Sequence, residues 1–459
     1  MNKISAFLDQ ICLHISCKAV HSEVRQELSE HIDELKDTYL SEGLNEDEAL
    51  NKAIAAMGDA DVIGTRLDKQ HRPQIEWSLL LLTVLIALFG GAAMYFIGQD
   101  SGQIQFPRYL FFSGVGLAVL LSVTMFDYTK LFKLSWFFYA AVNLILILGL
   151  FGARINGSHR VVYFAGYGFS PAGLLHFTII PLSVWLCQAE RWSDFIKLFL
   201  LAALPMVLTA LYPSMINILI FAVMLLVSAA VAVLKSNTLQ NKKQYIFICC
   251  LFLFLAAVIG FFLMPEYLRA KLWAFIDYNA DPLGAGYLPM TAQKWLMASK
   301  PIGATNFDIL GAPIDRTMPN AANEYVLVNI ITKFGWIAGL FLVAVVIVFL
   351  VRLFLTVSKV KNRFGFFLSL SACLVLTIKF VFSILMNFNL FPFADLSVPL
   401  ISYGGADYCV TMALIGIILS VWRRNNIVPA GKRKTEQMKE KNKFLSFHDG
   451  KLIIDFKKK

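Results

Sequence analysis

Long apolar runs recur along this chain and restrict its fold more than any other feature of the sequence. Ten runs follow Glu76, at about 78–97, 109–125, 134–151, 172–187, 197–212, 215–234, 244–264, 324–350, 365–386 and 404–422. A helix of about 20 apolar residues crosses the hydrocarbon core of a bilayer. Hydrophobic residues make up 58% of the chain and its mean hydropathy is +0.64, which excludes an ordinary soluble globule. We therefore predict an all-α polytopic membrane protein with about ten transmembrane helices.

The loops between the runs indicate how the chain is oriented. Basic residues gather in alternate loops and after the last run, at Lys130, Lys133, Arg191, Lys197, Lys235, Lys242, Lys243, Arg352, Lys359, Lys361, Arg363, Arg423 and Arg424. Loops rich in lysine and arginine stay on the cytoplasmic side of a membrane. We therefore expect a multi-pass protein with both termini cytoplasmic. We expect no signal peptide, because residues 1–73 are charged and amphipathic.

The formal charge of +10 is distributed unevenly. Residues 1–73 carry eight Lys and Arg against fourteen Asp and Glu, whereas residues 432–459 carry ten against four. Cytosolic loops and a basic tail beside anionic lipid account for this balance. No nucleic-acid-reading module is recognisable, so no nucleic acid is expected as a partner. Attraction between the acidic beginning and the basic tail, residues 426–459, is a further hypothesis.

Residues 1–73 are predicted to form a separate cytosolic helical domain. Apolar residues from Ile4 to Ile11 follow helical spacing, and a second amphipathic helix is expected over about 22–40. Asn45 is placed to cap a third helix that Gly58 ends. The pattern of this third helix resembles the small helical prefix domain that precedes bacterial permeases and sensors. The resemblance implies contact with a cytosolic partner that the sequence does not identify, and a solubilising cap without a partner is the alternative.

Residues 74–425 are expected to form the membrane domain, which has one large outer loop at 265–323. Loops of that length are usually functional, and amphipathic pieces at 267–275 and 290–299 are expected to lie along the outer leaflet. Smaller outward loops are expected near 98–108 and 152–171. The seven cysteines show no metal-ligand spacing, so neither a disulfide framework nor a metal site is expected.

Polar residues interrupt the apolar matrix in the outward loops. Arg160, beside His159, could hold a phosphate or serve as an ordinary loop arginine. The segment from Asp281 and Pro282 to Gly286 predicts a tight turn. Glu324 begins the eighth run, where a carboxylate could act as a general base or simply respond to the helix dipole.

Ionisable groups also lie within the runs themselves. Lys379, Ser383 and Asn387 recur every four residues, which places them along one side of a helix. A buried cation in a membrane span requires a partner, and either Asp395 or Asp407 could serve Lys379. Lys333 is a second buried cation whose partner the sequence does not show.

A turn-rich segment, Pro399-Leu400-Ile401-Ser402-Tyr403-Gly404-Gly405, opens the last run. Irregular backbone at membrane depth is tolerated only where protein or water covers it, so this turn should line an interior cavity. From Asn387 to Gly405, with Pro392 and Pro399 at the expected spacing, the chain resembles the SEDS family of shape, elongation, division and sporulation proteins, typified by FtsW, RodA and SpoVE. Asp281 to Tyr287 and Gly157 to Arg160 also resemble motifs of that family. The resemblance covers about 75–425.

The resemblance implies a peptidoglycan glycosyltransferase that polymerises lipid II at the outer face of the bacterial cytoplasmic membrane, with a class B penicillin-binding protein as partner. Glu324 falls at the position of the family's proposed catalytic base. Contact with substrate is expected from Arg160, His159, Lys333, Lys379, Asn387 and Ser402. A framework role is expected for Asp281, Pro282, Gly286, Pro392, Pro399, Tyr403, Gly404 and Gly405. No cofactor is implied, although a divalent cation is compatible with the chemistry.

Several charge-bearing positions of the family have changed in this chain. The base is Glu instead of Asp, the family's Glu-Glu pair is Thr332-Lys333, its Lys is His176 and one of its Asp residues is Ser214. Its Gln-Pro-Ser-Glu is here Ser-Pro-Ala-Gly, at 170–173, without the acid. These changes keep two alternatives open. One is a catalytically reduced homologue that acts as scaffold or regulator, and the other is a flippase for a lipid-linked precursor.

Overall fold

The computed structural model divides the chain into two compact units. The first comprises Met1–Ile75, Lys361–Arg363 and Trp422–Lys459, and the second comprises Glu76–Val360 and Phe364–Val421. The structure describes residues 3–101, 106–155, 158–164, 167–212, 214–236, 242, 266–279, 281–305, 311–318, 321–392, 396–402, 404–427, 445–448 and 451–454.

Four α-helices make up the N-terminal part of the first unit: α1 (Lys3–Leu13), α2 (His21–Ser41), α3 (Glu46–Met57) and α4 (Ala60–His71), with a 3-10 turn η1 (Lys18–Val20). The predicted cap is present, because the Asn45 side chain accepts the backbone N–H of Glu48 at 2.8 Å. Gly58 ends α3 with a φ of 95°, a conformation that favours glycine. The fourth helix was not predicted. Its N-cap is Asp59, which accepts the backbone N–H of Asp61.

Two apolar clusters hold these helices together. One is built on Ile11, Ile15, Val20, Val24 and Ala60, and the other on Leu8, Ile32 and Ala53. Ile427, which follows the last long helix, packs against the first cluster. The first unit therefore draws its core from both ends of the sequence. The antiparallel pair β4 (Leu445–His448) and β5 (Lys451–Ile454) belongs to the same unit.

The second unit contains the membrane-spanning helices. Within the described residues, nine segments are long and apolar enough to cross a membrane. They are α5 (Trp77–Ser101), α6 (Phe106–Met125), α7 (Thr129–Gly149), η2 with α8 (Pro171–Thr178 and Ile179–Gln188), α9 (Trp192–Ala210), α10 (Met215–Lys235), α16 (Trp336–Ser358), α17 (Arg363–Asn387) and α18 (Gly405–Arg423). Eight of them match predicted runs, and α16 overlaps the second half of the run predicted at 324–350. The predicted run at 244–264 lies outside the described residues.

The run predicted at 324–350 is not one helix, and this prediction was wrong. It forms α15 (Val326–Phe334) and α16, separated at Gly335, whose φ is 94°. Residues 300–305 cause the break, because Gly303 and Thr305 bond to the end of α15, while Pro301 accepts from the start of α16. A Cβ atom at Gly335 would lie 2.6 Å from the carbonyl oxygen of Pro301. Only glycine fits such a turn without strain.

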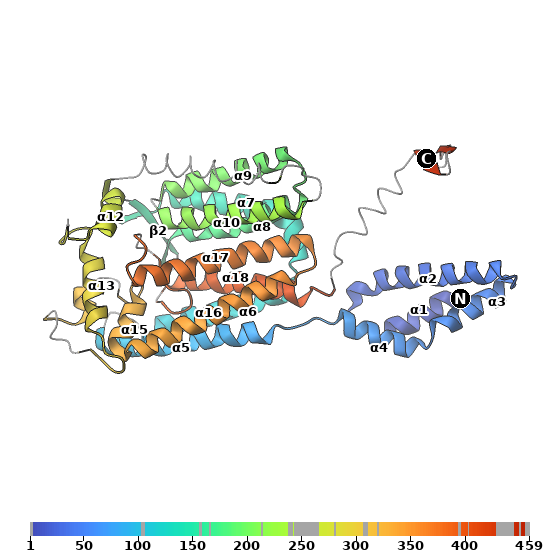
Figure 1. Ribbon diagram of the computed structural model, residues 1–459, viewed down its shortest axis with the longest axis horizontal. Helices are drawn as coiled ribbons and strands as arrows, with labels where there is room; N and C mark the ends of the chain where they lie inside the picture. Colours follow the sequence, from blue (N-terminus) through green and yellow to red (C-terminus); the bar gives the residue numbers. More distant parts are fainter. Residues whose placement is uncertain are drawn as a thin grey trace. The chain divides into compact units, whose positions relative to one another are not determined.

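Burial distinguishes the central helices from those that face lipid. In α17 and α18, 72% of the span window is buried, and the η2–α8 segment reaches 67%, whereas α6 has only 17%. Figure 1 shows α17 and α18 side by side, with α7, α8, α9 and α10 on one side and α5, α6 and α16 on the other. Of the polar residues predicted within the runs, Lys379, Ser383 and Asn387 therefore lie on α17, one of the two most enclosed spans, whereas Lys333 lies on α15.

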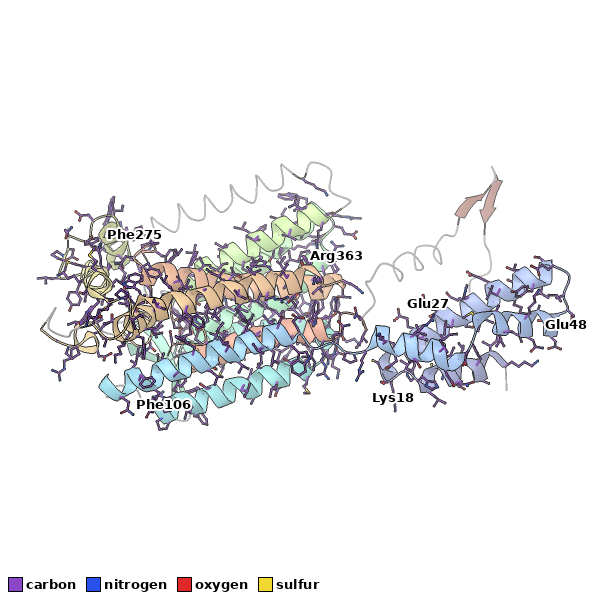
Figure 2. All side chains as sticks on the ribbon, turned by 60° about the horizontal axis from the view of Figure 1, so that its bottom comes forward. Lys18, Glu27, Glu48, Phe106, Phe275 and Arg363 are labelled. Carbon is purple, nitrogen blue, oxygen red and sulfur yellow. The ribbon has the colours of Figure 1, made fainter. Side chains whose placement is uncertain are left out.

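The elements between the spans gather at one end of the bundle. Figure 2 places Phe106 and Phe275 at this end and Arg363 at the opposite one. The same end contains α12 (Glu266–Ile276), α13 (Tyr287–Ala298) and α15 (Figure 1). The first two are helices over the amphipathic pieces predicted at 267–275 and 290–299, and their place along the outer leaflet stays a prediction. The segment expected as a simple loop at 152–171 contains an antiparallel sheet of β1 (Ala153–Ile155), β2 (Ser158–Phe164) and β3 (Tyr167–Phe169).

Candidate functional site

The residues around Glu324 are held by a side chain from α17. Asn387 is completely buried, and its amide nitrogen donates to the carbonyl oxygens of Glu324 at 2.9 Å and Ser383 at 2.8 Å. Its amide oxygen accepts the backbone N–H groups of Leu327 and Val328 at 3.1 and 3.2 Å. The first N–H groups of a helix have no partner within it. Asn387 therefore caps α15 from a neighbouring helix and uses both ends of its amide.

The turn that precedes α18 holds the adjacent residue, Asn323. The Ser402 hydroxyl donates to the carbonyl oxygen of Asn323 at 2.7 Å and accepts the backbone N–H of Val398 at 2.8 Å. The turn is tight, with Leu400 at a φ of 65°, and it packs on α5 at Gly90, where a Cβ atom would lie 2.6 Å from the Leu400 carbonyl oxygen. We term the hydrogen bonds from Asn387 and Ser402 to residues 323–328 the Glu324 clamp.

The clamp places Glu324 just before the first turn of α15. Its side chain is partly buried, and the positive end of the α15 dipole makes this a favourable place for a carboxylate. A pocket of about 80 Å³ opens beside the next residue, Tyr325, and is also lined by Lys271, Tyr278, Asn389 and Pro392. Glu324 itself is not among the lining residues of the pocket, but a carboxylate held at a helix start one residue away from it is a candidate for general base chemistry.

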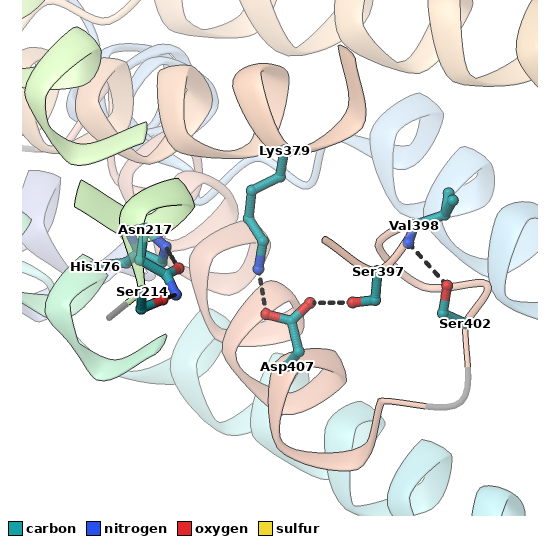
Figure 3. A network of polar contacts seen from close by, with 8 residues as sticks. All are labelled: His176, Ser214, Asn217, Lys379, Ser397, Val398, Ser402 and Asp407. Carbon is teal, nitrogen blue, oxygen red and sulfur yellow. Dashed lines mark hydrogen bonds and ion pairs between the residues drawn. The ribbon is translucent and has the colours of Figure 1, made fainter. Parts of the chain in front are cut away.

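Lys379 pairs with Asp407, one of the two acids that the sequence offered. The Lys379 side chain is 2% exposed and that of Asp407 is 31% exposed. The second carboxylate oxygen of Asp407 accepts the Ser397 hydroxyl at 2.9 Å, so the pair also reaches the turn before α18 (Figure 3). Asp395, the other candidate, lies outside the described residues. The lysine charge is therefore neutralised by a carboxylate of the same chain.

Two of the changed family positions are now joined by a chain of hydrogen bonds. His176 Nε2 lies 3.1 Å from Asn217 Oδ1, and the Asn217 amide nitrogen donates to the Ser214 hydroxyl at 2.7 Å (Figure 3). His176 is completely buried in η2. Sequence reasoning noted His176 and Ser214 separately but did not identify Asn217, which joins them.

Lys333 also has a partner that sequence reasoning missed. Its Nζ lies 3.9 Å from Oδ2 of Asp315, in the short helix α14 (Ile314–Thr317), and 3.5 Å from the carbonyl oxygen of Ile97. Both side chains of the ion pair are less than one-tenth exposed. An acid within the long outer loop was the available signal, but no spacing in the sequence links Asp315 to Lys333.

The turn at Asp281 is held together by its own groups. The Asp281 carboxylate accepts the backbone N–H groups of Gly284 and Ala285 at 3.0 and 2.8 Å, and its carbonyl oxygen accepts that of Gly286 at 3.0 Å. Pro282 lies inside this turn. A Cβ atom at Gly286 would collide with backbone oxygens. The turn leads directly into α13, as a framework element would.

The other predicted site residues that the structure describes lie on β2, in the turn before α18 and at the start of α18. Arg160 and His159 lie on β2, for which the backbone is described. Pro399 is buried in the turn and Gly405 begins α18, whereas Tyr403 lies outside the described residues. Gly404 donates its N–H to the carbonyl oxygen of Ser402.

Metal-binding chemistry receives no support from the part of the chain that is described. Among those residues, no group of three or more His, Cys, Asp or Glu side chains could hold a metal ion. The described cysteines, Cys12, Cys17, Cys187, Cys373 and Cys409, are free thiols. The compatibility of the proposed chemistry with a divalent cation stays a prediction.

Fold and site together define a polytopic helical membrane protein whose enclosed spans hold a carboxylate-bearing segment at one end of the bundle. The chain belongs to the FtsW, RodA and SpoVE family of cell cycle proteins, whose model matches residues 73–427.

Comparisons with known proteins extend over most of the chain. It is 24% identical to a probable peptidoglycan glycosyltransferase FtsW of Borreliella burgdorferi, over 75% of this chain and 94% of the relative. It is 22% identical to the peptidoglycan glycosyltransferase MrdB of Escherichia coli K12, over 77% and 94% of the two chains.

Solved structures share the fold. One chain, from a study of how a peptidoglycan synthase complex coordinates polymerization and crosslinking, has a TM-score of 0.64 at 21% identity and covers 77% of this chain and 99% of its own length. The rod shape determining protein RodA of Thermus thermophilus has a TM-score of 0.53 at 18% identity, over 76% and 97%.

Proposed function

We propose that this protein is a peptidoglycan glycosyltransferase that polymerises lipid II at the outer face of the bacterial cytoplasmic membrane. Family membership and the activities named for its relatives support the proposal. The observation that carries it is the Glu324 clamp, which fixes a carboxylate-bearing residue at the head of α15. A catalytic base must be held in position in this way to act on a bound hydroxyl.

In the proposed reaction, Glu324 accepts the proton of the acceptor sugar hydroxyl. The hydroxyl oxygen attacks the anomeric carbon of the donor, and the bond from that carbon to the lipid diphosphate breaks. The electron pair of that bond leaves with the diphosphate, which basic groups such as Arg160 stabilise. General base catalysis of this kind contributes about 10²–10⁴-fold to the rate.

The experiment compares polymerisation of lipid II by purified wild-type protein, Glu324→Ala and Glu324→Asp, with and without a class B penicillin-binding protein. Glu266→Ala is the matched control, because Glu266 is an exposed glutamate on α12 at the same end of the bundle. We expect strands from the wild type and the control, a loss of at least about 100-fold in Glu324→Ala, and partial activity in Glu324→Asp.

Two results would reject parts of this proposal. Absence of strands from the wild type, under conditions in which a standard family member works, would reject the polymerase. Undiminished activity of Glu324→Ala would remove Glu324 from the role of base while leaving the polymerase intact. Transport of labelled lipid II across vesicles without polymerisation would support a flippase instead.

The orientation of the chain follows from the same proposal. The end that carries α12 and β2 faces outward, and residues 1–73, the 361–363 loop and the tail lie in the cytoplasm, where residues 1–73 meet a cytosolic partner. Alternation of basic loops supports this orientation. A protease site placed before α1 should be cleaved in inverted vesicles and protected in intact cells.

A scaffold without catalytic activity is the second candidate. It is favoured by the hydrogen bonds that join His176 and Ser214 through Asn217, because the family resemblance implies a Lys and an Asp at the positions of His176 and Ser214. Under this reading, the protein would bind the class B penicillin-binding protein and raise its activity, while wild type and Glu324→Ala would behave identically.

A further inference from the structure

The ion pair between the buried Lys379 and the partly exposed Asp407 takes no part in the chemistry just proposed. We propose that this pair is a positioning device that sets the location of Glu324 by fixing the turn before α18. The proposal rests on the proposed role of Glu324 as the base. Lys379, Asp407, Ser397 and Ser402 are then positioning residues, instead of the substrate contacts that the sequence suggested for Lys379 and Ser402.

The first connection between α17 and the segment that carries Glu324 is direct. Lys379 and Asn387 are eight residues apart on α17, and hence on the same side of that helix. Asn387 donates to the carbonyl oxygen of Glu324. Helix α17 therefore holds the catalytic segment at one point by its own amide.

The second connection between α17 and this segment runs through the turn before α18. Lys379 binds one oxygen of Asp407, and the other oxygen accepts the Ser397 hydroxyl at 2.9 Å. Five residues further on, Ser402 donates to the carbonyl oxygen of Asn323, at 2.7 Å. The contacts close a ring that starts and ends on α17, and residues 323 and 324 are held within it (Figure 3 shows the members from Lys379 to Ser402).

Burial and charge both argue against a substrate role for Lys379. Its side chain is only 2% exposed and its charge is already matched by Asp407. Contact with a diphosphate would require this pair to break. Buried ion pairs also add little to stability compared with apolar residues of similar size, so a structural requirement for overall folding does not explain the pair. The ion pair is explained instead by the position in which it holds the turn before α18.

The test uses the full-length protein and the double substitution Lys379→Met with Asp407→Leu. Removing both charges leaves no unpaired buried ion, so we expect thermal unfolding close to that of the wild type. Hydrogen exchange in residues 321–330 should rise about tenfold or more. The kcat for lipid II polymerisation should fall about tenfold or more with KM unchanged, because misplacement of a reacting group by about 1 Å can cost 10²-fold in rate.

Ser402→Ala and Ser420→Ala form a second, matched pair. Both serines are buried. The Ser402 hydroxyl donates to the carbonyl oxygen of Asn323, and the Ser420 hydroxyl donates to that of Phe126. Only Ser402→Ala should raise exchange in 321–330 and lower kcat. If the double variant unfolds at a lower temperature than the wild type, the comparison of Ser402→Ala with Ser420→Ala decides whether the turn positions residues 323 and 324.

Unchanged exchange in 321–330 in the double variant and in Ser402→Ala would overturn the proposal. A rise in KM with unchanged kcat would overturn it in favour of substrate binding. If the wild-type protein makes no strands, the proposed enzymatic function fails, but the exchange measurements still decide whether the ion pair positions residues 323 and 324.

Discussion

Gly90 and Gly91 provide a sharp test of how tightly the turn before α18 is packed. They are neighbours in α5, yet a Cβ atom at Gly90 would lie 2.6 Å from the Leu400 carbonyl oxygen and 2.8 Å from the Ile401 Cα. At Gly91 the nearest atom would be Tyr109 Cε1, at 3.8 Å, which is an ordinary contact. The obstacle at Gly90 is backbone, which cannot rotate away.

The two alanine substitutions should therefore have opposite effects. Replacing glycine by alanine within a helix contributes about 1 kcal/mol of stability, and Gly91→Ala should show that gain or be neutral. At Gly90 an overpacking cost of about 1–3 kcal/mol opposes the same gain. We expect Gly90→Ala to be the less stable variant by about 1–3 kcal/mol.

Thermal unfolding in detergent and lipid II polymerisation measure the two consequences. Gly90→Ala pushes on Leu400 and Ile401, next to Ser402, so it should lower the unfolding temperature and also the rate of strand synthesis, whereas Gly91→Ala should lower neither. Indistinguishable stability and activity of the two variants would show that the turn does not rest on α5 as described.

Other parts of the fold give further predictions. Asn45→Ala should lower the free energy of unfolding of the first unit by about 1 kcal/mol, through loss of the α3 cap, measured by chemical denaturation followed by helical circular dichroism. Gly335→Ala should destabilise the protein more than Gly303→Ala in thermal unfolding, because both have positive φ but only Gly335 also faces nearby backbone; equal effects would contradict this. The backbone N–H of Ser16 lowers the pKa of Asp68, so this contact stabilises the folded state above the ordinary carboxyl pKa and the contribution is lost as pH falls through the lowered value. The protection of the Ser16 amide, expressed relative to its intrinsic exchange rate at each pH, should fall at acid pH in the wild type, and Asp68→Asn should flatten that dependence.

Sequence reasoning located the membrane helices because hydrophobicity over 20 residues is a local property. The break at Gly335 was missed for the opposite reason. A glycine in an apolar run is compatible with a continuous helix, and its positive φ is imposed by residues 300–305, some thirty positions away. Likewise, the cap on α4 was visible at Asp59, but only once a helix was suspected there.

The polar residues of α17 show what a sequence can and cannot reveal about a site. A buried lysine or asparagine in a span indicates that a partner exists, but it does not indicate whether that partner is substrate or protein. The structure supplies protein partners for Lys379, Lys333 and Asn387. Three-dimensional proximity decides this, and no sequence spacing encodes the pairing of Lys333 with Asp315.

Because Lys333 and Lys379 are paired with carboxylates, we expect the charge that stabilises the leaving diphosphate to come from other basic residues at the outer end of the bundle. A leaving diphosphate requires cations that are not already neutralised, and Lys333 on α15 and Lys379 on α17 each have a carboxylate partner in this chain. We therefore expect the stabilising charge from basic residues of the outer segments, of which Arg160 on β2 is the candidate that the sequence singled out. Arg160→Ala should lower kcat for polymerisation, whereas the paired Lys379→Met and Asp407→Leu substitutions should act through the position of Glu324. Hydrogen exchange in 321–330 separates the two, because it should change only when the ion pair is removed.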